Sequence, residues 1–385
     1  MRSVRPPKKY YIETFGCQAN EADSNKLEGI LEAAGLEKSV CLERADIFII
    51  NSCSVRQKSE DKVYGLARKL KTLSKKPFVV LGGCMVGSVQ GSRVLYPFEE
   101  LKKRTSWIDL YLNSDDLPTL PKYLVKEGFV DTYFPLDLED KGYIPDDRSR
   151  GYINISYGCD NFCTYCVVPY ARGPEISRSK EDILRNVKYL LDKGITEITL
   201  CGQNVNSWGL SPEQKRKIRI GDDTKLPFAD LLREIHDLAG IKLLSFISSN
   251  PFDFTQDLIS VLGLPKIDNY LHIAAQSGNN DVLARMNRRY TIEGFYDLID
   301  RVKKAKPNVR LGTDIIVGFP GETRGQFMDT TNLFQKVHFK VAFISMYSER
   351  VGTAAQRTYK DDVSLQEKKW RHAYLTSVWK ESLKQ

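Results

Sequence analysis

Three cysteines stand close together near the middle of the chain, at Cys159, Cys163 and Cys166. Their C-x3-C-x2-C spacing directly follows an apolar, strand-like stretch at 152–156. Thiolates are the usual protein ligands of iron–sulfur clusters, and a cubane cluster contains four irons. Three cysteines can hold three of these irons, which leaves the fourth iron open to a small molecule. The spacing therefore predicts a [4Fe–4S] cluster with one open iron.

Two other interpretations of this cysteine motif are a zinc knuckle and three unrelated cysteines of a core. A structural zinc site needs a fourth Cys or His, typically in a second pair. No Cys or His follows Cys166 until Cys201. The spacing therefore favours the cluster over the zinc site.

Three further cysteines each follow a predicted strand in the first part of the chain. Strand-like stretches at 9–15, 46–51 and 78–81 lead into Cys17, Cys53 and Cys84, with helices expected at 21–34 and 55–73. Strands that alternate with helices predict a parallel sheet, and such sheets bind ligands beyond the carboxyl ends of their strands. We therefore expect the three cysteines to meet at one site, against the alternative of three small buried residues. The other two cysteines, Cys41 and Cys201, are expected to be ordinary core or surface thiols, and no role is assigned to the four histidines.

The rest of the chain predicts a second α/β domain. Helical patterns at 180–193, 227–239, 292–304 and 324–337 separate strand candidates at 151–156, 195–201, 242–248, 270–275, 309–317 and 341–346. Six β/α units predict an open, incomplete form of the eightfold TIM barrel, whose active site lies at the carboxyl ends of the strands. The fold class is therefore α/β, with a parallel-sheet domain followed by an open (β/α)6 partial barrel. The stretch 110–147 is expected to be irregular connection and linker.

Short motifs accompany the cysteines in order along the chain. They lie at 14–21, 51–56, 83–84, 158–173, 202–206, 313–323 and 347–353. With these motifs the chain resembles the radical S-adenosylmethionine (SAM) methylthiotransferases, most closely the MiaB branch that modifies tRNA. The resemblance covers residues 10 to 355 and is specific, because all of the motifs occur in the same order.

This resemblance implies two [4Fe–4S] clusters and SAM as cofactors. Cys159, Cys163 and Cys166 would hold the cluster that cleaves SAM to a 5′-deoxyadenosyl radical, and Cys17, Cys53 and Cys84 an auxiliary cluster that provides sulfur. One SAM would supply the methyl group, and the radical from a second would remove hydrogen from C2 of an isopentenylated adenosine beside the tRNA anticodon. Polar and glycine turns at the strand ends are expected to bind SAM: Gly202, Gln203 and Asn204 at the methionyl group, and Ser277, Gly318 and Gly321 at the ribose and adenine.

The resemblance also implies the domain plan and the partners. Residues 1–147 would form the methylthiotransferase domain and 148–355 the radical SAM barrel. Residues 356–385 would form a helical tail. The chain departs here from the family, whose members usually end in a tRNA-gripping TRAM β-barrel: either the chain was shortened, or it binds tRNA by other surfaces. The expected partners are the tRNA anticodon stem-loop and an electron donor such as flavodoxin or ferredoxin, and the protein is expected to be a monomer.

Composition agrees with a cytoplasmic protein that binds a polyanion. The 385 residues carry a formal net charge of +8, with 42% apolar and 28% charged residues. No apolar run approaches the roughly 18 residues that span a bilayer, so no membrane association is expected. Phosphate contacts are expected from three basic segments: the helix at 56–76, the loop at 215–219 and the segment at 285–289.

Three alternative functions remain open at this stage. Two are methylthiotransferases with other substrates, namely threonylcarbamoyl-adenosine in tRNA or a ribosomal-protein aspartate. The third belongs to a different class, a non-catalytic metal-binding module that recognises RNA. Iron and sulfide content together with a visible spectrum would separate the enzymes from the module.

Overall fold

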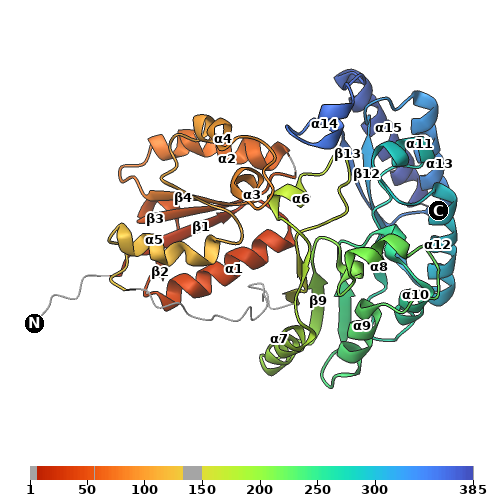
Figure 1. The fold of residues 1–385 in the computed structure, drawn as a ribbon, viewed down its shortest axis with the longest axis horizontal. Helices are drawn as coiled ribbons and strands as arrows, with labels where there is room; N and C mark the ends of the chain where they lie inside the picture. The colour runs from red at the N-terminus through yellow and green to blue at the C-terminus, as the bar shows by residue number, and fades with distance from the viewer. Residues whose placement is uncertain (1–6, 56, 133–149, 385) are drawn as a thin grey trace, which may run out of the picture. The chain divides into compact units, whose positions relative to one another are not determined.

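The computed structural model describes residues 7–55, 57–132 and 150–384, and the chain divides into two compact units (Figure 1). The first unit contains the described part of 7–132 together with Tyr157–Asp160 and Val167–Glu175. The second contains 150–156, Asn161–Cys166 and 176–384. The predicted domain boundary at residue 147 lies outside the described residues, so the three-part division stays a prediction.

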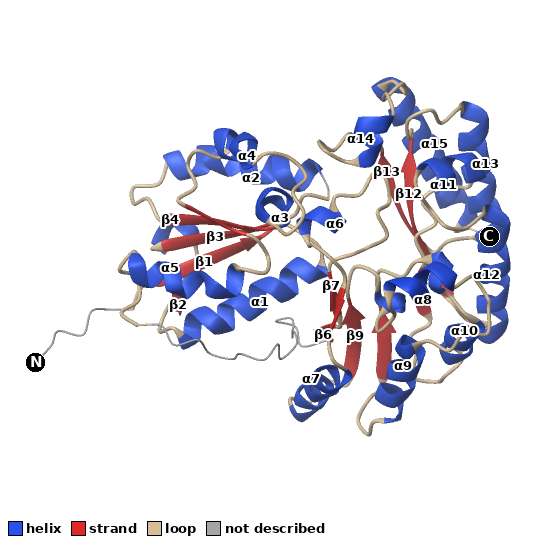
Figure 2. Cartoon of the chain, in the orientation of Figure 1, coloured by secondary structure: helices blue, strands red, loops and turns tan. Residues whose placement is uncertain are grey.

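A five-stranded sheet forms the centre of the first unit (Figure 2). Its order is β2-β1-β3-β4-β5, and every neighbouring pair is parallel, as the sequence predicted. The strands are β1 (Lys9–Thr14), β2 (Glu37–Lys38), β3 (Ile47–Ser52), β4 (Phe78–Gly83) and β5 (Leu110–Leu112). The helices are α1 (Gln18–Ala33), α2 (Gln57–Lys71), α3 (Cys84–Gln90), α4 (Phe98–Arg104) and α5 (Leu120–Lys126).

Both faces of this sheet are buried, which explains the continuous apolar run of β3. Phe48 and Ile50 pack into a cluster with residues of α2, whereas Ile47 and Ile49 pack into a second cluster with residues of α1 and α5. Successive side chains of a strand point to opposite faces, so helices on both faces demand apolar residues at every position.

The expectation of an irregular connection at 110–147 is wrong for its first part. Residues 110–112 form β5, a short 3-10 helix follows at Leu117–Thr119, and α5 begins at Leu120. Prolines stand in the first turn of both helical pieces, where a missing N–H costs nothing. These prolines mark helix starts and not loop residues. Residues 133–147 lie outside the described residues.

Six parallel strands follow one another in the second unit. They are β6 (Gly151–Asn154), β9 (Glu197–Cys201), β10 (Leu243–Phe246), β11 (Tyr270–His272), β12 (Arg310–Val317) and β13 (Val341–Met346). They form two three-stranded sheets, β6-β9-β10 and β11-β12-β13, linked by parallel bridges such as Ser249 with Ile273. A pair of short strands, β7 (Ser156–Tyr157) and β8 (Ile176–Ser177), lies apart from this series. The predicted α/β fold with an open series of six strands is confirmed.

The helices of the second unit lie close to their predicted positions. The long ones are α7 (Lys180–Asp192), α9 (Pro227–Asp237), α12 (Ile292–Ala305), α13 (Arg324–Val337) and α15 (Leu365–Ser382). The short ones are α8 (Pro212–Lys217), α10 (Gln256–Leu262), α11 (Asn280–Arg285) and α14 (Ala354–Thr358), whereas α6 (Val168–Ala171) belongs to the first unit. The predicted helical tail is α15, whose Leu375 is buried in the core of this unit.

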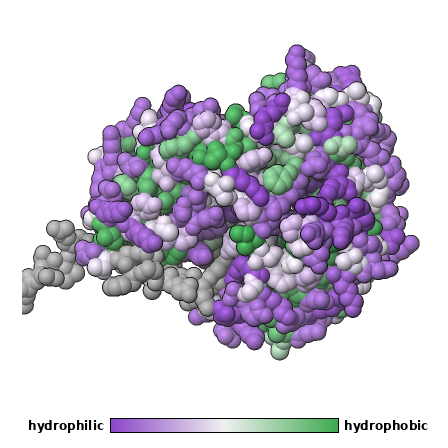
Figure 3. Space-filling model, viewed as in Figure 1, coloured by the Kyte–Doolittle hydropathy of each residue, from purple (hydrophilic) through white to green (hydrophobic). Residues whose placement is uncertain are grey.

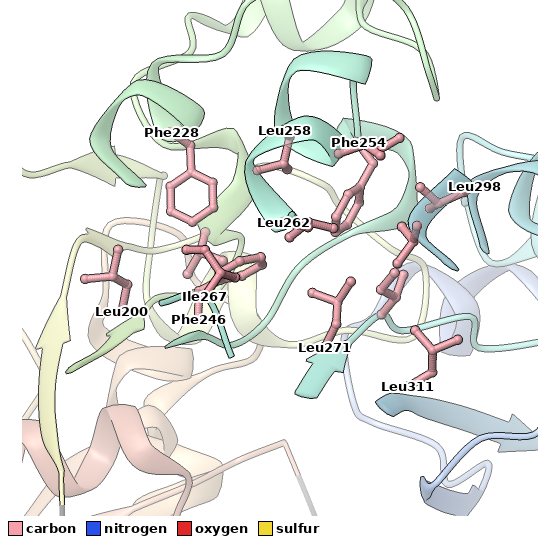
Figure 4. Packing of buried hydrophobic residues seen from close by; sticks show 14 of the residues in the cluster. Leu200, Phe228, Phe246, Phe254, Leu258, Leu262, Ile267, Leu271, Leu298 and Leu311 are labelled. Atoms are coloured by element: carbon pink, nitrogen blue, oxygen red, sulfur yellow. The ribbon is translucent and has the colours of Figure 1, made fainter. Parts of the chain in front are cut away.

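One hydrophobic core joins these helices to one side of the strands (Figure 4). Leu200 and Phe246 point from the strands towards Phe228 of α9, and Leu271 and Leu311 belong to the same cluster. Residues that alternate with these point to the other side, which we call the inner face. Thr199 and Ser245 of the inner face hydrogen bond through their hydroxyl groups at 2.7 Å. The helix side is therefore apolar and the inner face is partly polar.

The surface drawn in Figure 3 is mostly hydrophilic, including the area over α2 and α4 at the upper left. Most basic residues of α2, such as Lys58, Lys62 and Arg68, are exposed. Within the described ranges, no helix combines the length and the apolarity that a bilayer span requires.

Candidate iron–sulfur centres

The three dispersed cysteines all lie at the carboxyl edge of the first sheet. Cys17 is the N-cap of α1 after β1, Cys53 directly follows β3, and Cys84 directly follows β4 as the first residue of α3. These strands are neighbours in the sheet, and the chain reverses direction across it between β1 and β3. Open α/β sheets bind ligands at this type of switch point. The structure therefore brings the three cysteines to the edge where the sequence predicted their meeting.

Two buried asparagines fix the geometry of this edge. The Asn20 side chain donates to Asn51 Oδ1 at 3.0 Å and to the Ser52 carbonyl at 3.1 Å, while Asn51 donates back to the Asn20 carbonyl at 2.8 Å. A Cβ on Gly83 would lie 2.5 Å from Asn51 Oδ1, and Gly83 has a φ of 86°. Only glycine fits at that position. The asparagine pair thus ties the start of α1 to the end of β3, next to two of the cysteines.

Arg172 is a functional candidate that the sequence reasoning missed. Its side chain is 5% exposed, donates to Asp23 Oδ2 at 2.9 Å and hydrogen bonds the Cys84 thiol. Burial raises the pKa of Cys84, and the Arg172 guanidinium acts in the opposite direction by stabilising the thiolate. Cys17 is close enough to Cys84 to contribute to the same shift. A buried cation therefore stands among the ligands expected for the auxiliary cluster.

Helix α6 packs tightly on α3, and this packing positions Arg172, the C-cap residue of α6, beside Cys84. A Cβ on Gly87 of α3 would lie 2.0 Å from the carbonyl oxygen of Ala171. No larger residue than glycine could stand at Gly87 without displacing α6. In the sequence, Arg172 can be recognised only through the Val-Val-Pro-Tyr-Ala-Arg-Gly motif at 167–173.

Backbone contacts within each unit hold the central cysteine loop. Cys159 is 7% exposed, and its N–H donates to the Gly173 carbonyl at 3.2 Å. The N–H of Cys166 donates to the Cys163 carbonyl at 2.9 Å, which closes a turn. The Thr164 N–H donates to the Met286 carbonyl at 3.1 Å, just after α11. These three contacts join backbone groups, so the backbone itself helps to hold the shape of the loop.

Arg288 lies directly beside one of these thiols. Its guanidinium donates to Cys163 Sγ at 3.4 Å, to Asn250 Oδ1 at 3.0 Å and to the Ala274 carbonyl at 2.9 Å. The residue is 7% exposed, and its guanidinium carbon lies 5.4 Å from the ring centroid of Phe252 and 5.5 Å from that of Tyr290. The expectation that Arg288 contacts RNA phosphates is therefore wrong, because its side chain is buried and bonded within the protein. The expected loop at 215–219 is also partly helical, since it begins within α8.

The residues expected to bind SAM lie in three separate arrangements. Asn204 is fully buried and hydrogen bonds Asn250, which also accepts from Arg288, so Asn204 belongs to the network around Cys163. Gly202 and Gln203 precede it on the loop after β9, and a Cβ on Gly202 would lie 2.5 Å from Ser156 Oγ. Ser277 is fully buried with its hydroxyl 3.5 Å from Thr330 Oγ1. Their roles at SAM stay predictions.

Gly318 and Gly321 lie in a turn that rests on α15. The Gly318 N–H donates to Glu322 Oε2 at 2.6 Å, and its hypothetical Cβ would lie 2.5 Å from Lys368 Cγ. Arg371 of α15 donates to the same Glu322 oxygen at 2.8 Å. Both glycines have positive φ values of 70° and 73°. The turn therefore depends on α15, and a contact between these glycines and SAM stays a prediction.

Replacing Arg371 with Met is expected to destabilise the protein strongly. Glu322 and Arg371 have side chains that are 1% and 4% exposed, so loss of the cation leaves a carboxylate buried without its ion pair. Such a change costs about 3–5 kcal/mol of unfolding free energy. Arg324→Met is the matched control, because Arg324 is 69% exposed and its ion pair with Glu367 is worth about 0–1 kcal/mol. Chemical denaturation of both variants measures the difference, and equal losses would contradict the prediction.

The chemistry of the cysteine sites fits iron–sulfur clusters. All eight cysteines lie among the described residues, and none of them forms a disulfide. In the described ranges, no three Cys, His, Asp or Glu side chains are arranged to share one metal ion. A cubane cluster instead receives one thiolate on each iron, so its cysteines need not converge on one ion. The buried cations Arg172 and Arg288 each lie beside a candidate ligand, where they can offset thiolate charge.

Two family descriptions match the chain, each within one part of the fold. The Radical SAM superfamily matches residues 153–334, which run from β6 into α13. The Uncharacterized protein family UPF0004 matches residues 9–112, which run from β1 to β5. The two sets of candidate cysteines fall within these two matches, one set in each.

Curated relatives match over nearly the whole chain. A Thermoanaerobacter pseudethanolicus protein named tRNA-2-methylthio-N(6)-dimethylallyladenosine synthase is 39% identical over 358 residues, which cover 90% of this chain and 72% of the relative. A protein of the same name from Clostridium botulinum (strain Loch Maree / Type A3) is 40% identical over 367 residues, which cover 92% of this chain and 78% of the relative.

Solved structures share the fold at low sequence identity. The radical SAM methyltransferase TsrM from Kitasatospora setae, with cobalamin and a [4Fe-4S] cluster bound, has a TM-score of 0.62 and 15% identity, covering 91% of this chain and 77% of TsrM. The cobalamin-dependent radical enzyme OxsB has a TM-score of 0.54 and 12% identity, covering 98% of this chain and 56% of OxsB. At these identities the similarity shows the fold alone.

Proposed function

The chain belongs to the radical SAM methylthiotransferases, and we propose that it adds a methylthio group to C2 of isopentenylated adenosine beside the anticodon of tRNA. The observation that carries this proposal is the 39% identity to a curated tRNA-2-methylthio-N(6)-dimethylallyladenosine synthase across 90% of the chain. Both candidate cysteine sites lie within the two family matches, at residues 9–112 and 153–334. None of the relatives described above favours threonylcarbamoyl-adenosine, a ribosomal protein or a non-catalytic module.

The proposed ligands divide between two [4Fe–4S] clusters. Cys159, Cys163 and Cys166 would hold one, and the three cysteines at the edge of the first sheet would hold the other. When bound, these clusters and SAM supply the electron-transfer, radical, methyl and sulfur chemistry of the reaction. The protein's part is to bind these groups, orient them and exclude water.

Buried side chains of this chain suit that part. Cys53, Cys84 and Cys159 are 5%, 2% and 7% exposed, so their thiols are shielded from bulk water. Arg288 beside Cys163 and Arg172 beside Cys84 each place a positive charge where thiolates and clusters accumulate negative charge. In a buried site of low effective dielectric, such a charge stabilises the ionised ligand more than it would in water.

The remaining partner assignments follow from the proposed reaction. Electrons would come from a small carrier such as flavodoxin or ferredoxin, and the protein would act as a monomer in the cytoplasm, where its tRNA is found. Phosphate contacts would come from the exposed basic residues of α2 and α8, which include Lys58, Lys62, Arg68 and Arg216. Binding of this kind releases counterions and therefore weakens as salt concentration rises.

The test of the proposed function is turnover on a matched pair of RNAs. Anaerobically reconstituted protein is incubated with SAM, reductant and an anticodon stem-loop that either carries or lacks the isopentenyl group on its target adenosine. We expect the 2-methylthio nucleoside, measured by mass spectrometry, from the isopentenylated RNA and at least tenfold less from the other RNA, since a missing substrate group leaves its binding contacts unmade. Equal turnover on both RNAs, or methylthiolation of protein instead, would overturn the substrate assignment.

A further inference from the structure

A chain of three polar side chains crosses the inner face of the second unit. The Tyr270 hydroxyl and His272 Nδ1 are 3.0 Å apart, and His272 Nε2 and Asp314 Oδ2 are 2.7 Å apart. Tyr270 and His272 lie on β11, and Asp314 lies on the adjacent strand β12. None of these residues takes part in the cysteine networks described above, and the sequence reasoning gave the histidine no role.

Hydrogen-bond chemistry fixes the direction of this chain. An ionised carboxylate can only accept, so His272 Nε2–H donates to Asp314, and in this tautomer Nδ1 can accept from the Tyr270 O–H. Both ring nitrogens of His272 are therefore occupied. The histidine cannot act on a ligand directly, but it orients the Asp314 carboxylate.

The strand next to β11 makes room for this arrangement. A Cβ on Gly312 would lie 2.3 Å from the Tyr270 hydroxyl oxygen and 2.8 Å from His272 Nδ1. Gly312 pairs with His272 in the register of β11 and β12. Any larger side chain at Gly312 would push the tyrosine and the histidine out of place. The polar chain therefore requires glycine at position 312, which lies within β12 and has neither a turn nor a positive φ to account for it.

Asp314 and Phe343 present two different binding surfaces side by side. Phe343 of β13 pairs with Asp314 in the sheet register, and its ring centroid lies 5.8 Å from that of His272. The Asp314 side chain is 39% exposed and Phe343 is 49% exposed. An oriented hydrogen-bond acceptor thus stands next to an accessible aromatic ring.

A purely structural role accounts for only part of this arrangement. A polar chain that merely braced the sheet would need neither an accessible carboxylate nor an exposed phenyl ring. The neighbouring residues Leu311 and Ile315 of β12, which face the helices, are 3% and 1% exposed. The exposure is therefore specific to the inner face. A flat heterocycle with an exocyclic N–H matches both surfaces, because proteins hold splayed-out bases by stacking on aromatic rings and by hydrogen bonds to base edges.

We propose that Asp314 and Phe343 form a binding site for the target nucleobase, with His272 and Tyr270 as positioning residues for Asp314. Asp314 accepts a hydrogen bond from an exocyclic N–H of the base, and Phe343 stacks on its ring. β13 is the last strand of its sheet, and the side chains of Asp314 and Phe343 are both more than a third exposed. The inference rests on the proposed function. The adenine of SAM offers the same chemistry, and the test therefore separates the two sources.

The experiment measures RNA binding and SAM binding separately on the full-length, reconstituted protein. The RNA probe is an anticodon stem-loop with isopentenyladenosine at the target position, titrated by fluorescence anisotropy, and SAM binding is measured by equilibrium dialysis. Phe343→Ala and Asp314→Ala should each raise the Kd for RNA by on the order of tenfold, since stacking on one aromatic side chain contributes roughly that much per base. Phe343→Trp should retain binding. His272→Gln should raise KM for the RNA more than it lowers kcat, because a positioning residue acts through Asp314 on binding of the base.

Met328→Ala is the matched control, because Met328 is a 37% exposed apolar residue on α13, outside the inner face. It should leave both Kd values unchanged. If Phe343→Ala and Asp314→Ala weaken SAM binding and spare RNA binding, or change neither, the base-binding site is wrong. Failure of the proposed function would look different, because the wild-type protein would then form no methylthio product even though the binding titrations could still be read.

Discussion

Replacing Cys159, Cys163 and Cys166 together with Ala is expected to abolish reductive cleavage of SAM. Without these thiols the loop offers no ligand to iron, and no open iron remains to bind SAM. The expected result is loss of 5′-deoxyadenosine to the background level, measured by mass spectrometry after anaerobic incubation with dithionite. Iron and acid-labile sulfide should fall by about half, since one of two expected clusters is lost.

The loop itself should survive this change, which makes the result interpretable. Its shape depends on backbone bonds from Cys159 to Gly173, from Cys166 to Cys163 and from Thr164 to Met286, none of which uses a thiol. Cys41→Ala is the matched control, because Cys41 is a free thiol outside both sites. SAM cleavage by the triple variant at the wild-type rate would show that the cluster lies elsewhere.

Local sequence signals predicted most of the fold. The strands β6 and β9 to β13 and the helices α7, α9, α12 and α13 begin and end within a few residues of their expected positions. Each helix carries an apolar stripe at helical spacing, and a threonine or serine caps several of them, as Ser179 does for α7. These signals are local, so a single sequence contains them.

The sequence did not predict those helices and strands whose formation depends on contacts with residues distant along the chain. Helix α3 is only seven residues long and contains a glycine and two valines, which are weak helix formers. It forms where Gly87 lies against Ala171, a residue more than eighty positions further along the chain. Tertiary packing outweighs propensity at such a place. The same holds for β5 and α5, which were predicted to be linker.

The sequence identified the cysteines of the candidate sites, but it did not identify the buried arginines that lie beside them. Motif spacing identified the six cysteines, because each follows a strand or lies in one short loop. Arg172 donates to Asp23, which is 149 positions away in the sequence, and Arg288 donates to Cys163, which is 125 positions away. No periodicity or spacing connects such residues. A buried arginine could be suspected from sequence only through its motif, and Arg288 was instead assigned to the surface.

The same limit applies to the inner face. His272 and Asp314 are separated by 42 positions, and their contact follows from the pairing of β11 with β12 rather than from any motif. Alternation along β12 does predict that Asp314 faces away from Leu311 and Ile315. It does not say which residue of the next strand lies opposite. The missing information is the register between β11 and β12, which is known only from the folded sheet.

The second large effect is expected from replacing Cys17, Cys53 and Cys84 together with Ala. This variant should form 5′-deoxyadenosine at a rate close to that of the wild-type protein but yield no methylthio nucleoside. The reason is that the contacts of the central loop, including the Arg288 contact to Cys163, involve none of these three side chains. Mass spectrometry of both products from one reaction, with isopentenylated stem-loop RNA as substrate, measures the separation.

The outcome depends on whether the first unit keeps its fold without the three thiols, and the structure indicates that it does. Its sheet is stabilised by two apolar clusters, and the edge is held by the Asn20–Asn51 pair, whose hydrogen bonds do not involve sulfur. Cys84→Ala also removes a thiol beside the buried Arg172, but Asp23 still pairs with that cation at 2.9 Å. Asn51→Ala serves as the comparison that loosens the edge while keeping every thiol, and it should lower both products through lost stability. If the triple variant still made the methylthio nucleoside, the sulfur would have to come from a site other than this edge, and the auxiliary role of the three cysteines would be wrong.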